Sequence, residues 1–232
     1  MANFEVLNNE AHRNLRLRAR AEAGLHSVPI VLSEFSAAAA CCPIMLAKNP
    51  ENGRFYVAAL FGFEPGENLV SEDPGAARTF RPLDLERQAF FISGENIAVD
   101  RDHPQISEKE GEPLFGDDGE PTDTMRRVQR ALGLLATGNE ETERFIETLV
   151  ALRLIEPIDI SLSFDDGRKV RLDGLYTVSL DAIAELGDSD ALTLFRKGYL
   201  LLAYTLASSL RQISVLANRR NERLAAGSSL QR

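Results

Sequence analysis

Aromatic residues are scarce in this 232-residue chain: tryptophan is absent, and phenylalanine and tyrosine make up 7% of the sequence. Sites that hold single-stranded nucleic acid use aromatic rings as stacking platforms, so the scarcity argues against a base-stacking surface, and equally against a sugar platform. The 35 acidic residues outnumber the 26 basic ones and give a net charge of −9, which argues against general nucleic-acid binding. We therefore expect no nucleic-acid partner.

Cysteine is also rare, with Cys41 and Cys42 adjacent in the sequence. Neighbouring cysteines rarely bridge to each other, and two cysteines cannot build a disulfide framework. Both follow an alanine run at the end of an expected helix, so we interpret them as buried structural thiols. Reduced thiols are typical of a cytoplasmic protein.

Long uninterrupted apolar runs and a secretory signal are missing. The first residues carry neither a basic region nor an apolar one. Two apolar stretches, 28–47 and 198–217, are interrupted by Glu34 and by Arg211, and neither gives the run of about 20 apolar residues that a spanning helix needs. The sequence predicts a soluble cytoplasmic protein without membrane insertion, a pattern that leaderless export would share.

Residues with catalytic or metal-binding chemistry are few. None of the three histidines, His12, His26 and His103, is followed two positions later by an acid, and P-loop, Gly-x-Gly-x-x-Gly, Gly-x-Ser-x-Gly and Cys-x-x-Cys motifs are missing. The acidic segment 117–120 lacks the alternating ligands of a calcium loop and predicts a solvated turn. We therefore assign no catalytic residue, no metal ligand and no cofactor.

Hydrophobic periodicity predicts an α+β fold with an N-terminal antiparallel sheet and a largely helical C-terminal half. The sheet is expected to contain one inserted helix whose N-cap is Ser33, and the helical half a β-hairpin and a long terminal helix. The expected strands are 28–32, 44–47, 55–63, 158–164 and 169–172, and the expected helices are 34–42, 123–137, 140–153, 179–186 and 191–220.

A composition change near residue 100 suggests internal boundaries. Residues 100–123 contain nine acids, two basic residues and three prolines, so we expect a long exposed connection pinned by Leu114 and Phe115. The division that follows is a β-rich subdomain at 1–100, an acidic connection at 101–123 and a mainly helical subdomain at 124–232, together forming one compact domain.

Alternating arginines near the N-terminus predict a half-buried strand. Arg16, Arg18 and Arg20 alternate with Leu15 and Leu17, so the arginines share one face. This face could be an anion or RNA patch, and we favour instead a solvated face that pairs with the acidic half of the protein.

Two polar clusters are candidate binding sites. The first joins His12 and Arg13 to Glu34 and Phe35, and it could bind a small anion, orient a peptide, or simply tie a strand to a helix.

The second cluster places Asn68 in a Gly-Glu-Asn turn and Arg81 in a Phe-Arg-Pro segment shortly after it. This turn could cap a strand and anchor the segment that follows, as well as contribute to binding.

Several short motifs follow one another in a fixed order along almost the whole chain: His12-Arg13-Asn14-Leu15-Arg16, Val28-Pro29, Glu34-Phe35, Cys42-Pro43-Ile44, Gly66-Glu67-Asn68-Leu69, Gly111-Glu112-Pro113-Leu114-Phe115, Gly119-Glu120-Pro121, Asp173-Gly174-Leu175-Tyr176, Gly198-Tyr199 and Ser208-Ser209-Leu210-Arg211-Gln212. This series resembles the bacterial SapC-like family. The sequence departs from the family pattern after Phe80-Arg81-Pro82, where Gln88-Ala89-Phe90 stands in place of a Tyr-Pro-Phe and no tryptophan precedes it.

What the resemblance implies about function is limited. The family takes its name from a surface-layer protein, and its largely uncharacterised members are often encoded near outer-membrane receptors and cupin-like oxygenases. With the poor catalytic inventory, this context leads us to expect a non-catalytic binding or accessory protein that engages a protein or peptide partner.

Two alternatives stay open. One is a small-molecule enzyme, or an enzyme subunit, with a carboxylate–histidine site around His12 and Glu34. The other is a surface-layer or assembly protein, which would form homo-oligomers.

Overall fold

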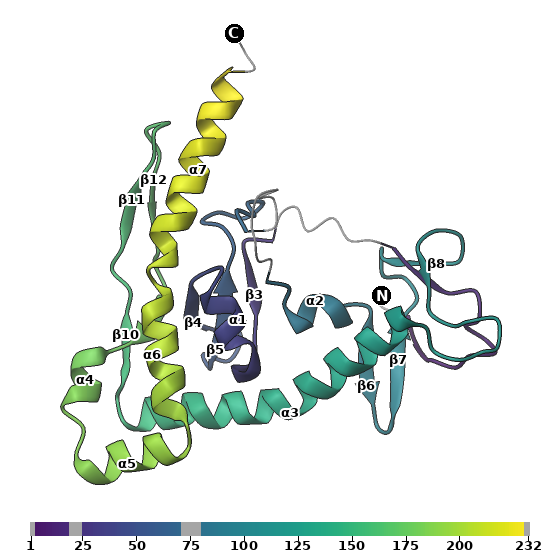
Figure 1. The fold of residues 1–232 in the computed structure, drawn as a ribbon, viewed down its shortest axis with the longest axis horizontal. Helices are drawn as coiled ribbons and strands as arrows, with labels where there is room; N and C mark the ends of the chain where they lie inside the picture. Colours follow the sequence, from purple (N-terminus) through teal and green to yellow (C-terminus); the bar gives the residue numbers. More distant parts are fainter. Residues whose placement is uncertain (1–2, 19–24, 71–79, 230–232) are drawn as a thin grey trace. The chain divides into compact units, whose positions relative to one another are not determined.

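The structure is a computed structural model that describes residues 3–18, 25–70 and 80–229 (Figure 1). It is an α+β protein, as predicted. Contacts within the chain group its residues into two compact units, and each consists of segments far apart in the sequence. Unit 1 contains residues 1–21 and 81–137, and unit 2 contains residues 22–80 and 138–232. The boundaries of these units differ from those of the expected β-rich subdomain at 1–100, acidic connection at 101–123 and mainly helical subdomain at 124–232. That division stays a prediction.

Unit 1 combines two small antiparallel sheets with helical segments. The first sheet has the strand order β1-β7-β6, and the second has the order β8-β2-β9. The bounds are β1 Phe4–Val6, β2 Arg16–Leu17, β6 Phe90–Ser93, β7 Asn96–Asp100, β8 Ile106–Ser107, β9 Glu112–Pro113, α2 Leu83–Arg87 and the first part of α3, which runs over Asp123–Ala151.

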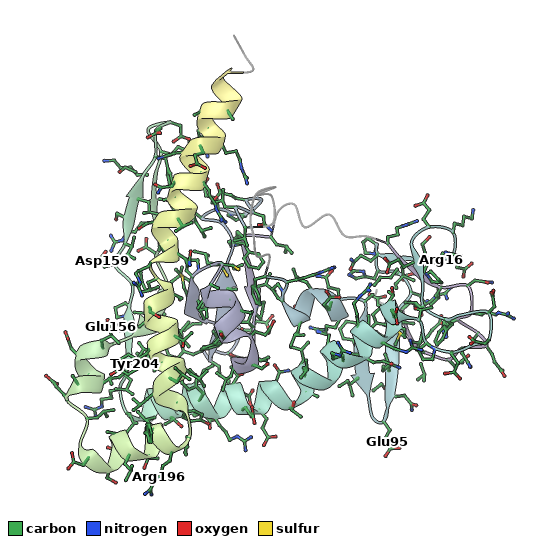
Figure 2. All side chains as sticks on the ribbon, viewed as in Figure 1. Arg16, Glu95, Glu156, Asp159, Arg196 and Tyr204 are labelled. Carbon is green, nitrogen blue, oxygen red and sulfur yellow. The ribbon has the colours of Figure 1, made fainter. Side chains whose placement is uncertain are left out.

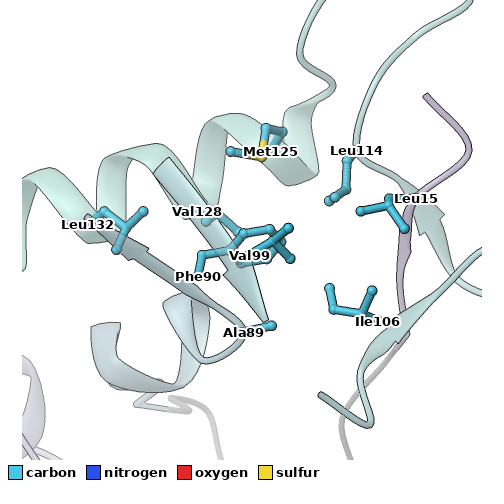
Figure 3. Close-up of a cluster of buried hydrophobic side chains, with 9 residues drawn as sticks. All are labelled: Leu15, Ala89, Phe90, Val99, Ile106, Leu114, Met125, Val128 and Leu132. Atoms are coloured by element: carbon cyan, nitrogen blue, oxygen red, sulfur yellow. The ribbon is translucent and has the colours of Figure 1, made fainter. Parts of the chain in front are cut away.

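The core of unit 1 is a cluster of nine buried hydrophobic side chains (Figure 3). Met125, Val128 and Leu132 supply the helical side of this cluster, because spacings of three and four residues place them on one face of α3. The other members come from the strands and the segments beside them: Leu15, Ala89, Phe90, Val99, Ile106 and Leu114.

The acidic segment 101–123 is built into unit 1. Ile106 and Leu114 are buried in its core, and Phe115 packs against the same cluster. Strands β8 and β9 of this segment pair with the two sides of β2. Leu114 and Phe115 thus pin the segment as expected, whereas the sequence pattern did not reveal its two-residue strands, which are too short to show periodicity.

Unit 2 is built on a five-stranded antiparallel sheet with the order β10-β13-β4-β5-β3. Helix α6 packs against β4, β13 and the inserted helix α1, so helices cover this part of the sheet. The strands are β3 Ser27–Pro29, β4 Ile44–Lys48, β5 Phe55–Leu60, β10 Ile155–Pro157 and β13 Leu175–Val178, with a separate hairpin of β11 Ser161–Ser163 and β12 Lys169–Arg171. The helices are η1 Leu32–Glu34, α1 Phe35–Ala39, α4 Leu180–Ala184, α5 Asp188–Arg196, α6 Tyr199–Ser209, α7 Gln212–Ser229 and the last part of α3.

Several predictions about the helices are wrong. Helix α3 is continuous across Gly138, which we expected to end a helix. A Cβ at Gly138 would lie 2.9 Å from the side chain of Val31, so this glycine permits close packing. The expected terminal helix is divided into α5, α6 and α7, first at Gly198, whose φ of +74° is left-handed, and again at residues 210–211. The predicted Ser33 cap is also wrong, since Val31 occupies the N-cap position of η1.

Among the described residues, one helical region is long and apolar enough to cross a membrane. It spans Tyr199–Ala226, with a mean hydropathy of 1.4 in its most apolar window, of which 28% is buried in the protein. Core helices of water-soluble proteins have the same length and composition, and Ala203, Leu206 and Ser209 of α6 are buried within unit 2. This helical region therefore gives only weak support for a location in a membrane. The expectation that the protein does not insert into a membrane stays a prediction.

Candidate functional site

The first polar cluster expected from the sequence is distributed over the two units. In unit 1, His12 is buried, with its Nε2 atom 3.0 Å from Oε2 of Glu5. The backbone N–H of Asn8 donates to Nδ1 of the same ring, so a tautomer protonated at Nε2 satisfies both contacts. Arg13 donates to the carbonyl oxygen of Asp117 at 2.9 Å. These contacts fix the start of the chain within unit 1.

The other members of that cluster lie in unit 2. The Oε2 atom of buried Glu34 accepts a hydrogen bond from the N–H of Val31 at 3.0 Å and so caps η1. Phe35 is buried, and its ring packs edge-on against Phe145 at a centroid distance of 6.0 Å. These contacts give Glu34 a capping role and Phe35 a core role, and a joint His12–Glu34 site stays a prediction.

The second expected cluster is also divided between the units. Asn68 is buried in unit 2, where its Oδ1 atom accepts from the N–H of Val70 at 3.0 Å. Arg81 lies in unit 1 and forms an ion pair with Glu86 at 3.0 Å. The turn at Asn68 is thus held by its own side chain, as the capping interpretation requires.

Helix α7 holds the same turn through arginines that the sequence analysis missed. Arg223 donates to the carbonyl oxygen of Asn68 at 2.8 Å, and Arg219 donates to that of Leu69 at 3.1 Å. The side chain of Arg220 is 6% exposed and lies 2.7 Å from Glu64 and 3.5 Å from Glu67. The three arginines at 219, 220 and 223 lie in α7, directly after the strongly apolar helix α6. This change from apolar to basic residues was the signal in the sequence that could have indicated them.

Two large grooves lie along the last part of α3 in unit 2. The first groove, between α3 and the α5–α6 turn, has a volume of about 940 Å³, and we call it the α5–α6 groove. The second, between α3 and the β4–β5 turn, has a volume of about 710 Å³, and we call it the hairpin groove. Both are lined by Glu147 and Ala151, so one stretch of α3 forms a wall of each.

The α5–α6 groove has mixed polar and apolar walls. Helix α3 contributes Arg144 and Glu147, while α5 and the turn after it contribute Asp190 and Lys197. The Nζ atom of Lys197 lies 5.6 Å from the centre of the Tyr199 ring, which also lines the groove. The walls of this groove therefore carry both signs of charge beside an aromatic ring.

The hairpin groove is bounded by a turn that its own side chains hold in place. The Oδ1 atom of Asn49 accepts from the N–H of Glu51 at 2.8 Å, and that of Asn52 accepts from the N–H of Arg54 at 2.9 Å. Gly53 has a left-handed φ of +69°, which glycine adopts without steric cost. The turn therefore presents Arg54 from a defined backbone.

Lys48 is fixed beside this turn by two aromatic rings. Its Nζ atom lies 5.0 Å from the centre of the Phe55 ring and 5.2 Å from that of Tyr176, and the two rings pack edge-on. Cation–π attraction of this kind holds an ammonium group without neutralising its charge. Lys48 therefore remains a positive charge on the wall of the groove.

The opposite wall of the hairpin groove is acidic. Glu143 and Glu147 lie one turn apart on α3 and are exposed. Among the residues that the structure describes, neither of them, nor Lys48 or Arg54, forms an ion pair. Like charges four residues apart destabilise a helix slightly, so this pair does not contribute to the stability of α3. The apolar surface between the walls comes from Phe55, Ile146 and Val150.

Neither groove has a cysteine or a histidine among the described residues that line it. Cys41 and Cys42 are both buried and unbridged. Burial, followed by the charge of neighbouring Cys41, raises the pKa of the Cys42 thiol far above its usual range, so this thiol stays protonated. Over the described parts of the chain, no group of three or more histidine, cysteine or acidic side chains is arranged to hold a metal ion.

Comparison with protein families gives a match that spans most of the sequence. The model of the SapC family matches residues 7–216, which is most of the chain. This chain belongs to the SapC family. The match includes both grooves, the Asn68 turn and the N-terminal cluster at His12, and it confirms the resemblance seen in the sequence. No curated protein and no solved structure matches the chain.

Proposed function

We propose that this SapC-family protein is a non-catalytic binding or accessory protein whose unit 2 engages another protein or a peptide. The observation that carries the proposal is the pair of grooves that share Glu147 and Ala151 of α3. In the hairpin groove, Val150 is 48% exposed, although its side chain is purely apolar. Apolar groups rimmed by charged residues are typical of protein interaction sites.

Further support comes from the exposed apolar side chains of α5 and α6. Phe195 is 70% exposed and Leu201 is 73% exposed. Tyr204, which is 49% exposed, projects from α6 (Figure 2). These exposed side chains also favour self-assembly as a second candidate function, because a second copy of the chain could cover them.

Site-specific photo-crosslinking tests the proposal. A photo-reactive phenylalanine analogue replaces Val150 in the full chain, and a matched variant carries it at Val215, which is 40% exposed on α7 and lines neither groove. We expect a discrete crosslinked protein from native lysate at position 150 and not at position 215, with its identity read by mass spectrometry.

Two other results would change the assignment. The same products at both positions would contradict a binding site beside α3. A crosslinked dimer of the chain itself would replace the accessory function by self-assembly.

A further inference from the structure

The hairpin groove has walls of opposite charge. Lys48 and Arg54 stand on the side of the β4–β5 turn, and Glu143 and Glu147 stand on the side of α3. Within the described residues these four side chains have no ion-pair partner, so their charges are available to a ligand. A ligand of one sign would be attracted by one wall and repelled by the other.

The surface between the walls is apolar. Ile146 is buried, whereas Val150 is 48% exposed and Phe55 is partly buried at the edge of the groove. An apolar side chain of a bound peptide would cover Val150 and remove it from water. The residues on either side of it in the peptide could then contact the two charged walls.

We propose that the hairpin groove binds a short segment of a partner protein that combines an acidic, an apolar and a basic side chain. The acidic side chain contacts Lys48 and Arg54. The basic side chain contacts Glu143 and Glu147, and the apolar one contacts Val150. This assignment rests on the proposed function and specifies the chemistry of the partner. Charge complementarity is what selects a mixed-charge peptide over a uniformly acidic or basic one.

Selection from a random peptide library displayed on phage tests the assignment. The library is panned against the full-length protein and against a charge-swapped variant that combines Lys48→Glu, Arg54→Glu, Glu143→Lys and Glu147→Lys. We expect the wild-type protein to enrich peptides with acid and base on opposite sides of an apolar residue. The swapped variant should enrich peptides in which the two charges have exchanged places.

Affinity measurements on variants of one wall at a time then show how much each wall contributes to binding. Fluorescence polarisation with the enriched peptide should show about a tenfold loss for Lys48→Glu/Arg54→Glu and a similar loss for Glu143→Lys/Glu147→Lys. The control variant Lys169→Glu/Glu222→Lys changes two exposed charges outside the groove and should bind like the wild type. Salt at about 0.5 M should weaken wild-type binding, because screening shortens the reach of exposed charges.

The outcomes separate this inference from the proposed function. Absence of enrichment, enrichment without a charge pattern, or the same peptides for both proteins would overturn the charge assignment. If the Val150 crosslink is nevertheless specific, the accessory function stands with a different partner chemistry. If the charge pattern of the enriched peptides changes with the charges of the walls but no protein crosslinks at Val150, the groove assignment stands and the accessory function fails.

Discussion

The two units use arginine in different ways to hold irregular segments. In unit 1, Arg16 is partly buried and Arg18 is exposed, and each donates to a backbone carbonyl oxygen of the segment 101–123 at 3.1 Å. In unit 2, Arg220 is almost fully buried and joins α7 to Glu64 and Glu67. Exposed ion pairs contribute little to stability, whereas removing one partner from a buried pair is costly. The comparison indicates that unit 1 distributes its anchoring over many weak contacts, whereas unit 2 concentrates most of it in the buried Arg220, beside the weaker contacts of Arg219 and Arg223.

The same comparison explains where unpaired charge is tolerated. Unit 2 buries side chains from a five-stranded sheet and several helices, so the main source of its stability is this burial and not the charges of the hairpin groove. Unit 1 relies on strands as short as two residues, and the charged side chains near β2 take part in holding them. Unit 2 can therefore leave the charges of its groove unpaired without losing its anchor.

The largest effect is expected at the concentrated anchor. Replacing Arg220→Met removes the charge that faces Glu64 and Glu67, whose side chains are 40% and 16% exposed, and we expect a loss of about 2 to 3 kcal/mol in the free energy of unfolding. All four tyrosines lie in unit 2, so tyrosine fluorescence during urea unfolding reports on this unit. The matched variant Arg223→Met, at an exposed position on the same helix, should lose less than about 1 kcal/mol. Equal losses in the two variants would contradict the contrast between buried and exposed arginine.

An intermediate effect is expected at two glycines of α3, one in each unit. Gly138→Ala would place a methyl group 2.9 Å from Val31, and we expect a net loss of about 1 to 2 kcal/mol from overpacking. At Gly133 no atom lies within 4 Å of the added methyl group, so Gly133→Ala should stabilise the protein by about 0.5 to 1 kcal/mol. Thermal unfolding followed by circular dichroism measures both changes. Stabilisation by both substitutions would show that Val31 can move away from α3.

How far the sequence predicts this molecule differs between its regions. The expected strands at 44–47 and 55–63 correspond to β4 and β5, although β5 already ends at Leu60. They could be predicted because apolar residues and a turn rich in asparagine and glycine act locally. The continuity of α3 was not predicted because Gly138 is needed for close packing against Val31, which is distant in the sequence. Helix propensity depends on the local sequence and does not reveal such a contact.

The candidate site was harder to predict than the fold. Lys48, Arg54, Glu143 and Glu147 are ordinary surface residues in the sequence, and they become a site because the fold places a turn beside a helix. Conversely, His12 and Glu34 were candidate site residues because of their ionisable side chains. In the structure His12 contacts Glu5 and Glu34 accepts from the N–H of Val31, so each has a structural partner close to it in the sequence. Residue type alone therefore predicted neither the location of the grooves nor the sign of their walls.

The smallest effect is expected at Glu112, where the distributed contacts of unit 1 can be tested through pH. Hydrogen bonds from Thr124 and then from Arg127 lower the pKa of the Glu112 carboxyl below its usual value of 4.5. A lowered pKa in the folded state means that this contribution to stability is present above pH 4.5 and is lost as the pH falls through the folded value. Because the side chain is 65% exposed, Glu112→Gln should cost less than about 1 kcal/mol near neutral pH.

Urea unfolding of the wild type and Glu112→Gln across the acid range should show their difference in stability shrink toward zero as the pH falls. In an Arg127→Gln background, which lacks one of the two hydrogen bonds, the difference should already be smaller near neutral pH. A difference that grows as the pH falls would require a raised pKa in the folded state, since only then does protonation favour folding. That result would place Glu112 outside the network of weak contacts that anchors unit 1.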